Sequence, residues 1–304
     1  MRHLPAKPIK KMRSRSGFTA WFSLNERVTG GLLLLAILLS WPAWPARTAM
    51  DGESAPSGVY GTVNAGFALD EDDRHDVSSL DVLAPLLEGP DSLIFAQFGG
   101  RNQDSRNTVN LGAGGRLFIH RWMLGLNAFF DNDATGKNRR LTLGSEIRTD
   151  YINLSANIYY RLTDERQSRD FSALDERPAT GYDMRGEAYL PALPQLGAKM
   201  VFEQYFGEGV ALFDKNIRLD STRALTVGLS FTPIPLLTLA AEERAGSGDQ
   251  SDSRISLRII YRLGLPWREQ IDPQAVARMR LLDVSRYDAV DHENLMVLNY
   301  LRPR

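Results

Sequence analysis

The chain has 304 residues, 43% of them hydrophobic, and a net charge of −1. Its first thirty residues include seven basic residues and one acidic residue, so the remainder carries a net charge of −7, which argues against nucleic acid as a partner. The chain contains no cysteine, which excludes thiol catalysis, cysteine-bound zinc and disulfides. We expect no cofactor and no bound metal ion.

The basic N-terminal residues run into the apolar stretch GLLLLAILLSW (residues 31–41), which precedes small residues in PAWPARTA. This order is typical of a secretory signal peptide. The apolar core is about ten residues long, whereas a membrane-spanning helix needs roughly 20. We therefore predict a signal peptide over residues 1–49 and a short periplasmic lead over residues 50–58. An N-terminal anchor helix is the alternative.

Twelve strand-like runs follow between residues 59 and 263, and longer polar connectors alternate with short ones. The longer connectors cover residues 70–76, 102–106, 131–139, 163–181, 207–222 and 246–253, and the short ones are GPD, IHR, Asp150, PALPQ and PIP. Outer-membrane barrels have short turns at one end and longer loops at the other. The pattern predicts an all-β fold, a twelve-stranded antiparallel transmembrane β-barrel of the outer membrane. A soluble all-β sandwich with one solvated face is the alternative.

Polar and apolar residues alternate along these runs. In ALTVGLSFT (residues 224–232), for example, every second residue is leucine, valine or phenylalanine. Charged residues should face the lumen, because a lysine or arginine on the lipid face costs roughly 2–4 kcal/mol at mid-bilayer. The predicted lumen-facing network contains Arg116, Glu146, Arg148, Arg161, Asp183, Arg185, Glu187, Lys199, Glu203, Glu242, Arg258 and Arg262. Aromatic residues near the ends of runs, Tyr189 and Tyr205 among them, indicate interfacial girdles.

A helix is predicted after the barrel, over residues 273–285. Asp272 is a favourable N-cap, Pro273 suits the first helical position, and residues recur at intervals of three to four through QAVARMRLLDV. Its candidate lumen-binding residues are Asp272, Arg278, Arg280 and Arg286. The three arginines would pair with lumenal carboxylates such as Glu146, Glu187, Glu203 or Glu242, and would make the helix a plug inside the lumen. A short amphipathic helix outside the pore is the alternative.

The sequence offers little support for catalysis. None of the four histidines lies in a motif with a serine nucleophile, and no HExxH or GxSxG pattern is present; these histidines are His3, His75, His120 and His292. We therefore expect the chain not to be an enzyme. Gly99 and Gly112 lie inside strand-like runs, where glycine marks close approach or curvature. The acidic run DEDD (residues 70–73) is interpreted as a solvated loop tip rather than a cation site.

Seven stretches carry more distinctive motifs. They are SSLDVLAPLLEGPDSLIFAQFGGRNQDSRNTVNLGAGGR (78–116), WMLGLNAFFDND (122–133), DERPATGYDMRGEAYLPALPQLGAK (175–199), FEQYFGEGVALF (202–213), TVGLSFTPIPLLTLA (226–240), YRLGLPWREQIDP (261–273) and SRYDAVDHENLMVLNY (285–300). Together they closely resemble the membrane domain of the intimin/invasin family, the inverse autotransporters. The resemblance implies a twelve-stranded barrel over residues 59–263 in the outer membrane of a Gram-negative bacterium. It also implies that residues 264–304 form a helix and linker that thread back through the lumen.

The resemblance further implies a translocator or anchor barrel for the surface display or export of an adhesin passenger, with a role in virulence. The sequence ends at Arg304, where a passenger would begin, so we expect the passenger to be absent from this chain. The alternatives are a surface protein that adheres to cells through the loops at 163–181 and 207–222, and a porin-like channel. The expected partners are outer-membrane lipids, the barrel-assembly machinery, periplasmic chaperones, and a separately encoded exported protein or a host surface.

Overall fold

The computed structural model describes residues 60–70, 77–103, 105–292 and 296–303, within a compact unit that spans Ser57–Arg304. The predicted signal peptide, most of the DEDD run and the histidines His3 and His75 lie outside these residues. Among the described residues, no helix has the length and apolarity needed to cross a membrane.

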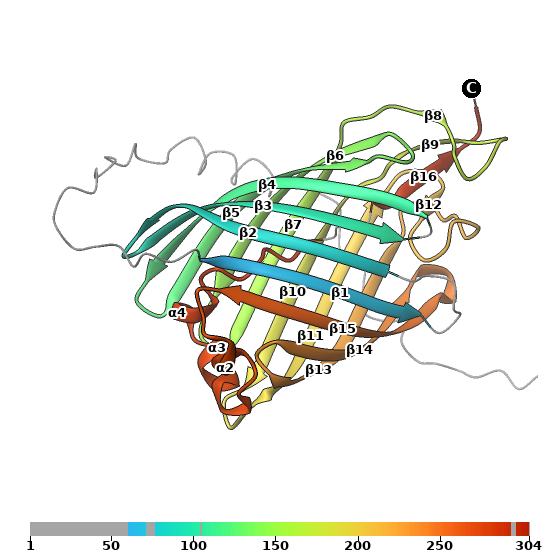
Figure 1. Cartoon of the computed structure of the whole chain (residues 1–304). Helices are drawn as coiled ribbons and strands as arrows, with labels where there is room; N and C mark the ends of the chain where they lie inside the picture. The colour runs from blue at the N-terminus through green and yellow to red at the C-terminus, as the bar shows by residue number, and fades with distance from the viewer. Residues whose placement is uncertain (1–59, 71–76, 104, 293–295, 304) are drawn as a thin grey trace, which may run out of the picture. The chain divides into compact units, whose positions relative to one another are not determined.

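Twelve antiparallel strands form a closed barrel (Figure 1). They are β1 (Gly61–Asp70), β2 (Val77–Gly89), β3 (Ser92–Gln103), β4 (Arg106–Ile119), β5 (Trp122–Asp133), β6 (Asn138–Arg148), β7 (Ile152–Arg161), β10 (Thr180–Leu190), β11 (Leu193–Phe206), β13 (Arg223–Ile234), β14 (Leu237–Gly246) and β15 (Ser251–Leu263). The first and last strands close the barrel, with Gly61 opposite Leu263 and Asp70 opposite Arg254. The predicted fold class is confirmed.

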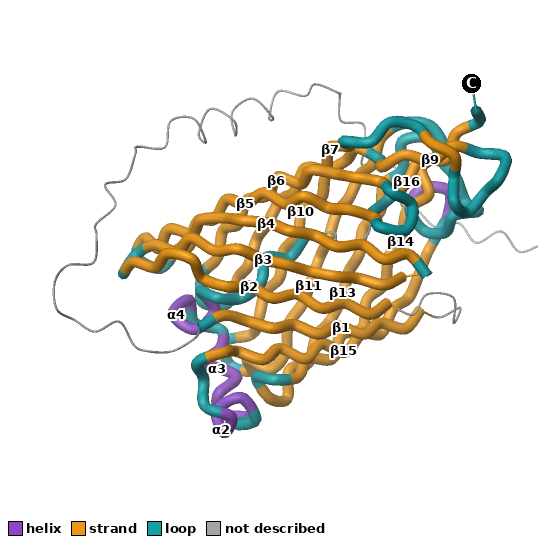
Figure 2. The backbone as a smooth tube through the Cα atoms, turned by 45° about the horizontal axis from the view of Figure 1, so that its top comes forward, coloured by secondary structure: helices purple, strands orange, loops and turns teal. Residues whose placement is uncertain are grey.

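The two ends of the barrel differ. At the short-turn end, two or three residues connect the strands, at 90–91, 120–121, 149–151, 191–192 and 235–236. At the loop end, two of the connections carry the short strands β8 (Arg166–Gln167), β9 (Asp175–Pro178) and β12 (Val210–Ala211), and η1 (Ser247–Asp249) lies between β14 and β15. The C-terminal strand β16 (Leu298–Leu301) joins these short strands in a four-stranded sheet of order β12-β16-β9-β8. Figure 2 shows this loop-end sheet and the C-terminal helices at opposite ends of the barrel.

Strand boundaries shorten several of the predicted connectors; residues 180–181, for example, belong to β10 and residues 251–253 to β15. Residues 131–133 belong to β5 and residues 138–139 to β6, so only residues 134–137 form the turn. The connector predicted at 102–106 likewise shrinks to residues 104–105. These strand ends are polar on both faces: Asp131 and Asp133 are buried in the lumen, whereas Asn132 alternates with them on the outward face. A strand end that is polar on both faces has the same composition as a loop.

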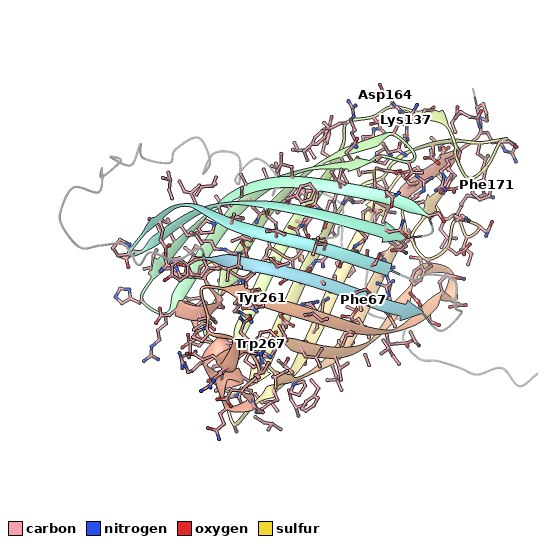
Figure 3. The ribbon with its side chains drawn as sticks, viewed as in Figure 1. Phe67, Lys137, Asp164, Phe171, Tyr261 and Trp267 are labelled. Atoms are coloured by element: carbon pink, nitrogen blue, oxygen red, sulfur yellow. The ribbon has the colours of Figure 1, made fainter. Side chains whose placement is uncertain are left out.

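The outer surface of the barrel is apolar, as the alternation predicts. Leu229 and Ile255 have 69% and 67% of their surface exposed, at positions that would face lipid. Gly112 marks close approach, as predicted for this residue, because a Cβ there would lie 2.2 Å from the Phe129 ring. In Figure 3, Tyr261 and Trp267 lie near the short-turn end of this surface, and their ring centroids are 6.4 Å apart.

The predicted helix over residues 273–285 is broken into short pieces. These are η2 (Pro273–Ala275), α3 (Val276–Met279) and α4 (Leu282–Ser285), and a separate short helix, α2 (Trp267–Gln270), precedes the predicted range. Asp272 does cap the first turn of the predicted range by accepting a hydrogen bond from the amide of Gln274. The break comes at Leu281, whose backbone is extended, and the amide of Leu282 donates to the side chain of Asp150 at 3.1 Å. A tertiary cap therefore interrupts the helix that the sequence periodicity predicted.

Candidate functional site in the barrel lumen

The segment after the helices passes through the barrel as an extended chain, which we call the lumen linker (residues 286–297; residues 293–295 are outside the description). It enters at the short-turn end, where Arg286 donates to the carbonyl of Gly89 at 3.1 Å and Arg116 donates to the carbonyl of Arg286 at 2.7 Å. The Tyr287 ring stacks on Tyr60, with centroids 5.6 Å apart. Residues 288–292 of the linker thus form no helix inside the lumen, while the helices stay at the mouth.

A buried charge cluster lies beside this entrance. Glu146 accepts from Arg116 at 3.0 Å and from Arg148 at 2.5 Å, and the side chains of Glu146 and Arg116 are at most 1% exposed. Glu146 projects from β6 and Arg116 from β4, the two strands that flank β5, and both residues stand opposite Gly125 of β5. Because Gly125 has no side chain, there is room for the pair. Because buried ions lose hydration, such a cluster persists only when every charge is paired.

Polar side chains of the wall hold the middle of the linker. Asp288 accepts from Arg262 at 2.9 Å, and Asp291 accepts from Arg185 at 3.1 Å. Between them, the Gln97 side chain accepts from the amide of Val290 at 2.8 Å and donates to its carbonyl at 3.2 Å. The linker is therefore attached to opposite walls of the barrel.

Further along, the linker carries a buried histidine. The His292 ring stacks on Phe129 with centroids 4.1 Å apart, and its Nε2 lies 3.6 Å from Asp131. Asp131 also accepts from Arg140 at 2.9 Å and from Thr142 at 2.7 Å. The sequence pattern does not reveal this group, because Asp131 lies in a run with the composition of a connector. The strand in fact extends through Asp131, which stands directly opposite Arg140.

The structure places all twelve predicted network residues on the inward-facing side of the barrel. Besides the contacts above, Asp183 pairs with Arg185 at 2.8 Å, Lys199 with Glu242 at 3.2 Å and Glu203 with Arg244 at 2.6 Å. The remaining three differ in their surroundings. Glu187 accepts from Asn153 at 3.4 Å, Arg258 borders two lumenal cavities, and Arg161 stands opposite Arg140 near the loop end.

The predicted partners of the C-terminal arginines are wrong. Arg278 is exposed and pairs with Glu269 at 3.3 Å, outside the lumen. Arg280 donates to the Thr232 hydroxyl at 2.9 Å and lies 3.5 Å from the centroid of the Tyr189 ring, and the carboxylate nearest Arg286 is Glu88 at 3.6 Å. The carboxylates expected to bind these arginines already have partners on the barrel wall.

Two aromatic residues expected in the interfacial girdles also lie inside the barrel. Tyr189 lines a lumenal cavity beneath Arg280. Tyr205 is fully buried and stacks on Tyr159, with ring centroids 5.9 Å apart. Tyrosines near strand ends occupy both faces of this barrel, so position along the strand alone does not assign the face.

The linker leaves the lumen at the loop end and becomes β16. The amide of Ala179 donates to the carbonyl of Val297 at 2.8 Å, and β16 pairs with β9 on one side and β12 on the other. The Tyr300 hydroxyl donates to Asp170 at 2.7 Å, and Asp170 also accepts from Arg106 at 2.6 Å. Burial raises the pKa of Asp170, but these two hydrogen bonds outweigh it and hold that pKa below its ordinary value.

Comparison with known proteins identifies related barrels. Residues 53–294 match the family described as the inverse autotransporter β-domain. The chain is 47% identical over 241 residues to invasin of Yersinia enterocolitica and 43% identical over 241 residues to intimin of Escherichia coli O127:H6. Each alignment covers 79% of this chain but only 29% and 26% of those proteins, so the chain spans less than a third of their length.

A solved structure has the same fold. It comes from work titled "Unveiling the Mechanism Behind the in-meso Crystallization of Membrane Proteins" and is 43% identical, with a TM-score of 0.77, over 79% of this chain and 99% of the solved chain. The closed barrel and these matches place the protein in the outer membrane of a Gram-negative bacterium. In such barrels the short turns face the periplasm and the longer loops face outward.

Proposed function

Because this chain belongs to the inverse autotransporter family, of the intimin and invasin type, we propose that its barrel exports an adhesin passenger through the lumen and anchors it at the cell surface. One observation carries the proposal. The linker crosses the whole lumen from the short-turn end and finishes as β16 in the loop-end sheet. Polypeptide joined after β16 would therefore begin outside the cell.

The loop contacts support export over direct adhesion by the loops. The connections at 162–179 and 207–222 contribute β8, β9 and β12, and these strands hold β16 in place. Their ordered parts are thus used to secure the end of the linker. A porin-like role fits less well, because the linker and its side-chain contacts occupy much of the lumen.

The test uses the full chain with a peptide epitope and a small immunoglobulin-like domain fused after Arg304. Intact Gram-negative cells should bind an antibody to this epitope. As a control, the same epitope inserted between His120 and Arg121, in a two-residue turn at the short-turn end, should be detected only after the outer membrane is permeabilised. Detection of the C-terminal epitope only after permeabilisation would refute the proposal.

A further inference from the structure

Five side chains of the barrel wall hydrogen-bond to the main chain of the lumen linker rather than to its side chains. They come from five different strands and reach the main chain of residues 286, 287, 289, 290 and 291. The donors to main-chain carbonyls, with their distances, are Arg116 (2.7 Å), Thr62 (2.8 Å), Arg148 (3.5 Å), Gln97 (3.2 Å) and Asn157 (3.5 Å). A main-chain carbonyl is present at every residue of any polypeptide, so these contacts do not depend on the linker sequence.

Gln97 makes the most complete of these contacts. Its amide group pairs with both the N–H and the C=O of Val290, as a neighbouring strand would in a sheet. The Gln97 side chain lies in the lumen near the middle of β3, and the residue is only 1% exposed. A buried amide needs hydrogen-bond partners, and the main chain of Val290 supplies one to each end of the Gln97 amide group.

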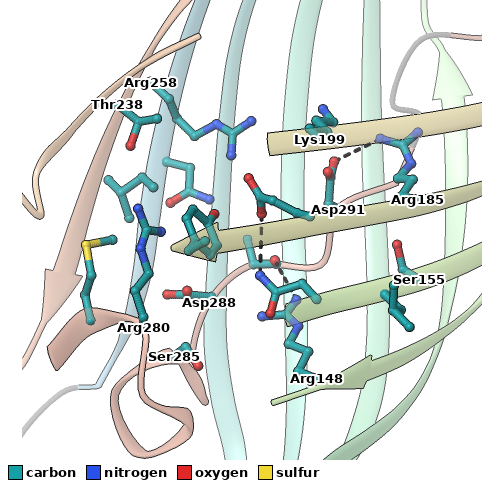
Figure 4. Close-up of a pocket in the computed structure, with 18 of the residues that line it drawn as sticks. Arg148, Ser155, Arg185, Lys199, Thr238, Arg258, Arg280, Ser285, Asp288 and Asp291 are labelled. Carbon is teal, nitrogen blue, oxygen red and sulfur yellow. Dashed lines mark hydrogen bonds and ion pairs between the residues drawn. The ribbon is translucent and has the colours of Figure 1, made fainter. Parts of the chain in front are cut away.

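The side chains of the linker have room next to this contact. Two cavities, of about 110 and 210 Å³, lie beside it, and both are bordered by Ala289 and Asp291. Figure 4 shows Asp291, Lys199 and Arg258 among the residues that line the smaller cavity. Each volume is far above the roughly 10–15 Å³ that one buried water requires. Larger or differently charged side chains can therefore replace those of the linker.

We infer that the lumen contains a binding track for extended polypeptide main chain, centred on Gln97, which accepts segments of different side-chain sequence. Main-chain hydrogen bonds supply the attachment in such recognition, and the space beside the chain sets how much side chain is tolerated. This inference rests on the proposed function in one respect, that an exported passenger would pass along the same track. Each residue that moves past Gln97 then offers it the same pair of main-chain groups.

The first test measures amide hydrogen exchange at residue 290 in the folded full chain, without any passenger. The triple variant Asp288→Ser, Asp291→Ser, His292→Ser removes the side-chain contacts that the linker makes on either side of Val290 and should keep this amide protected. Gln97→Met should accelerate its exchange at least about tenfold, because both hydrogen bonds are lost. Gln103→Met is the matched control: Gln103 is a buried glutamine on the same face of β3 that borders the larger cavity, and this variant should change nothing at residue 290.

Two results overturn the inference: protection that is lost in the triple variant, or protection that survives Gln97→Met. If Gln97→Met does not give a folded barrel, Thr62→Val makes the same test at the entrance, because it keeps the side-chain shape and removes the bond to the Tyr287 carbonyl. Faster exchange over residues 286–292 is then expected, and unchanged exchange would overturn the inference.

The second test follows the arrival of a fused passenger at the cell surface. Gln97→Met should lengthen the half-time at least about threefold, whereas Gln103→Met and the triple variant should not. Equal half-times for the two methionine variants would count against the track. If the unmodified barrel brings no passenger to the surface, the proposed function fails, while the exchange measurement still decides the inference about the track.

Discussion

Glu146 is the residue whose loss should destabilise the barrel most clearly. Its carboxylate is almost fully buried and is shared by the guanidinium groups of Arg116 and Arg148. In the variant Glu146→Gln the shape is kept and hydrogen bonds can still form, but two buried cations lose their common counter-charge. Removing one partner from a buried ion pair costs about 3–5 kcal/mol. Because the amide retains some hydrogen bonding, we expect a loss near the lower limit, about 3 kcal/mol in the free energy of unfolding.

Equilibrium unfolding in urea, in detergent micelles, measures this loss, with the shift of the heat-modified band on gels as the probe of the folded barrel. Glu187→Gln is the control, because Glu187 is half-buried and its hydrogen bonds, a long one from Asn153 and one with Tyr189, are to uncharged side chains. That variant should cost less than about 1 kcal/mol. Two results would show that the buried ion pairs of Glu146 do not stabilise the barrel in this way. Both variants would lower the free energy of unfolding equally, or Glu146→Gln would lower it by less than about 1 kcal/mol.

Two further predictions concern the surface and the loop end. Leu229, which is 69% exposed, should face lipid, so Leu229→Lys should lower the free energy of unfolding in bilayers by about 2–4 kcal/mol, whereas an equal effect of Leu229→Ala would contradict the lipid assignment. The pKa of Asp170 is lowered in the folded protein. Its stabilising contact with Tyr300 is therefore complete above the ordinary carboxyl pKa of about 3.9, and this contact is lost as the pH falls through the lower pKa of the folded state. Pepsin cleavage next to β16 should therefore increase sharply only below about pH 3.9, and Asp170→Asn should remove this step; identical pH profiles would rule out the contact as the cause.

The barrel could be predicted from the sequence because the patterns that specify it lie within short stretches of the chain. Alternation at period two assigns the face of each residue, as at Leu229 and Ile255, and connector length separates the two ends. Boundaries were harder to predict, because the strand ends at the loop end are polar on both faces and have the composition of a loop. Asp131 was misplaced for this reason, and with it the contact to His292.

The lumen linker could be predicted only in part. The family resemblance implied a chain through the pore, but the helix periodicity around Val276 and Met279 favoured a helical plug. Asp150, from a turn more than 130 residues earlier, ends that helix by binding the amide of Leu282. Gln97 and Val290 are 193 residues apart, so no local pattern could pair them. When a side chain binds the main chain of another segment, the amino-acid sequence of that segment shows no matching residue type. Contacts of this kind can be found only in the structure.

The short helices at the periplasmic mouth also have a mechanical consequence. Val276, Met279 and Leu282 are buried there, and Arg280 and Asp150 tie the helices to the rim. An outward pull on β16 acts along the linker and draws this folded segment against the mouth of the barrel. The helices at the periplasmic mouth thus oppose tension that is applied from outside the cell. The force is transmitted to the barrel wall, in which every strand is hydrogen-bonded to both neighbours.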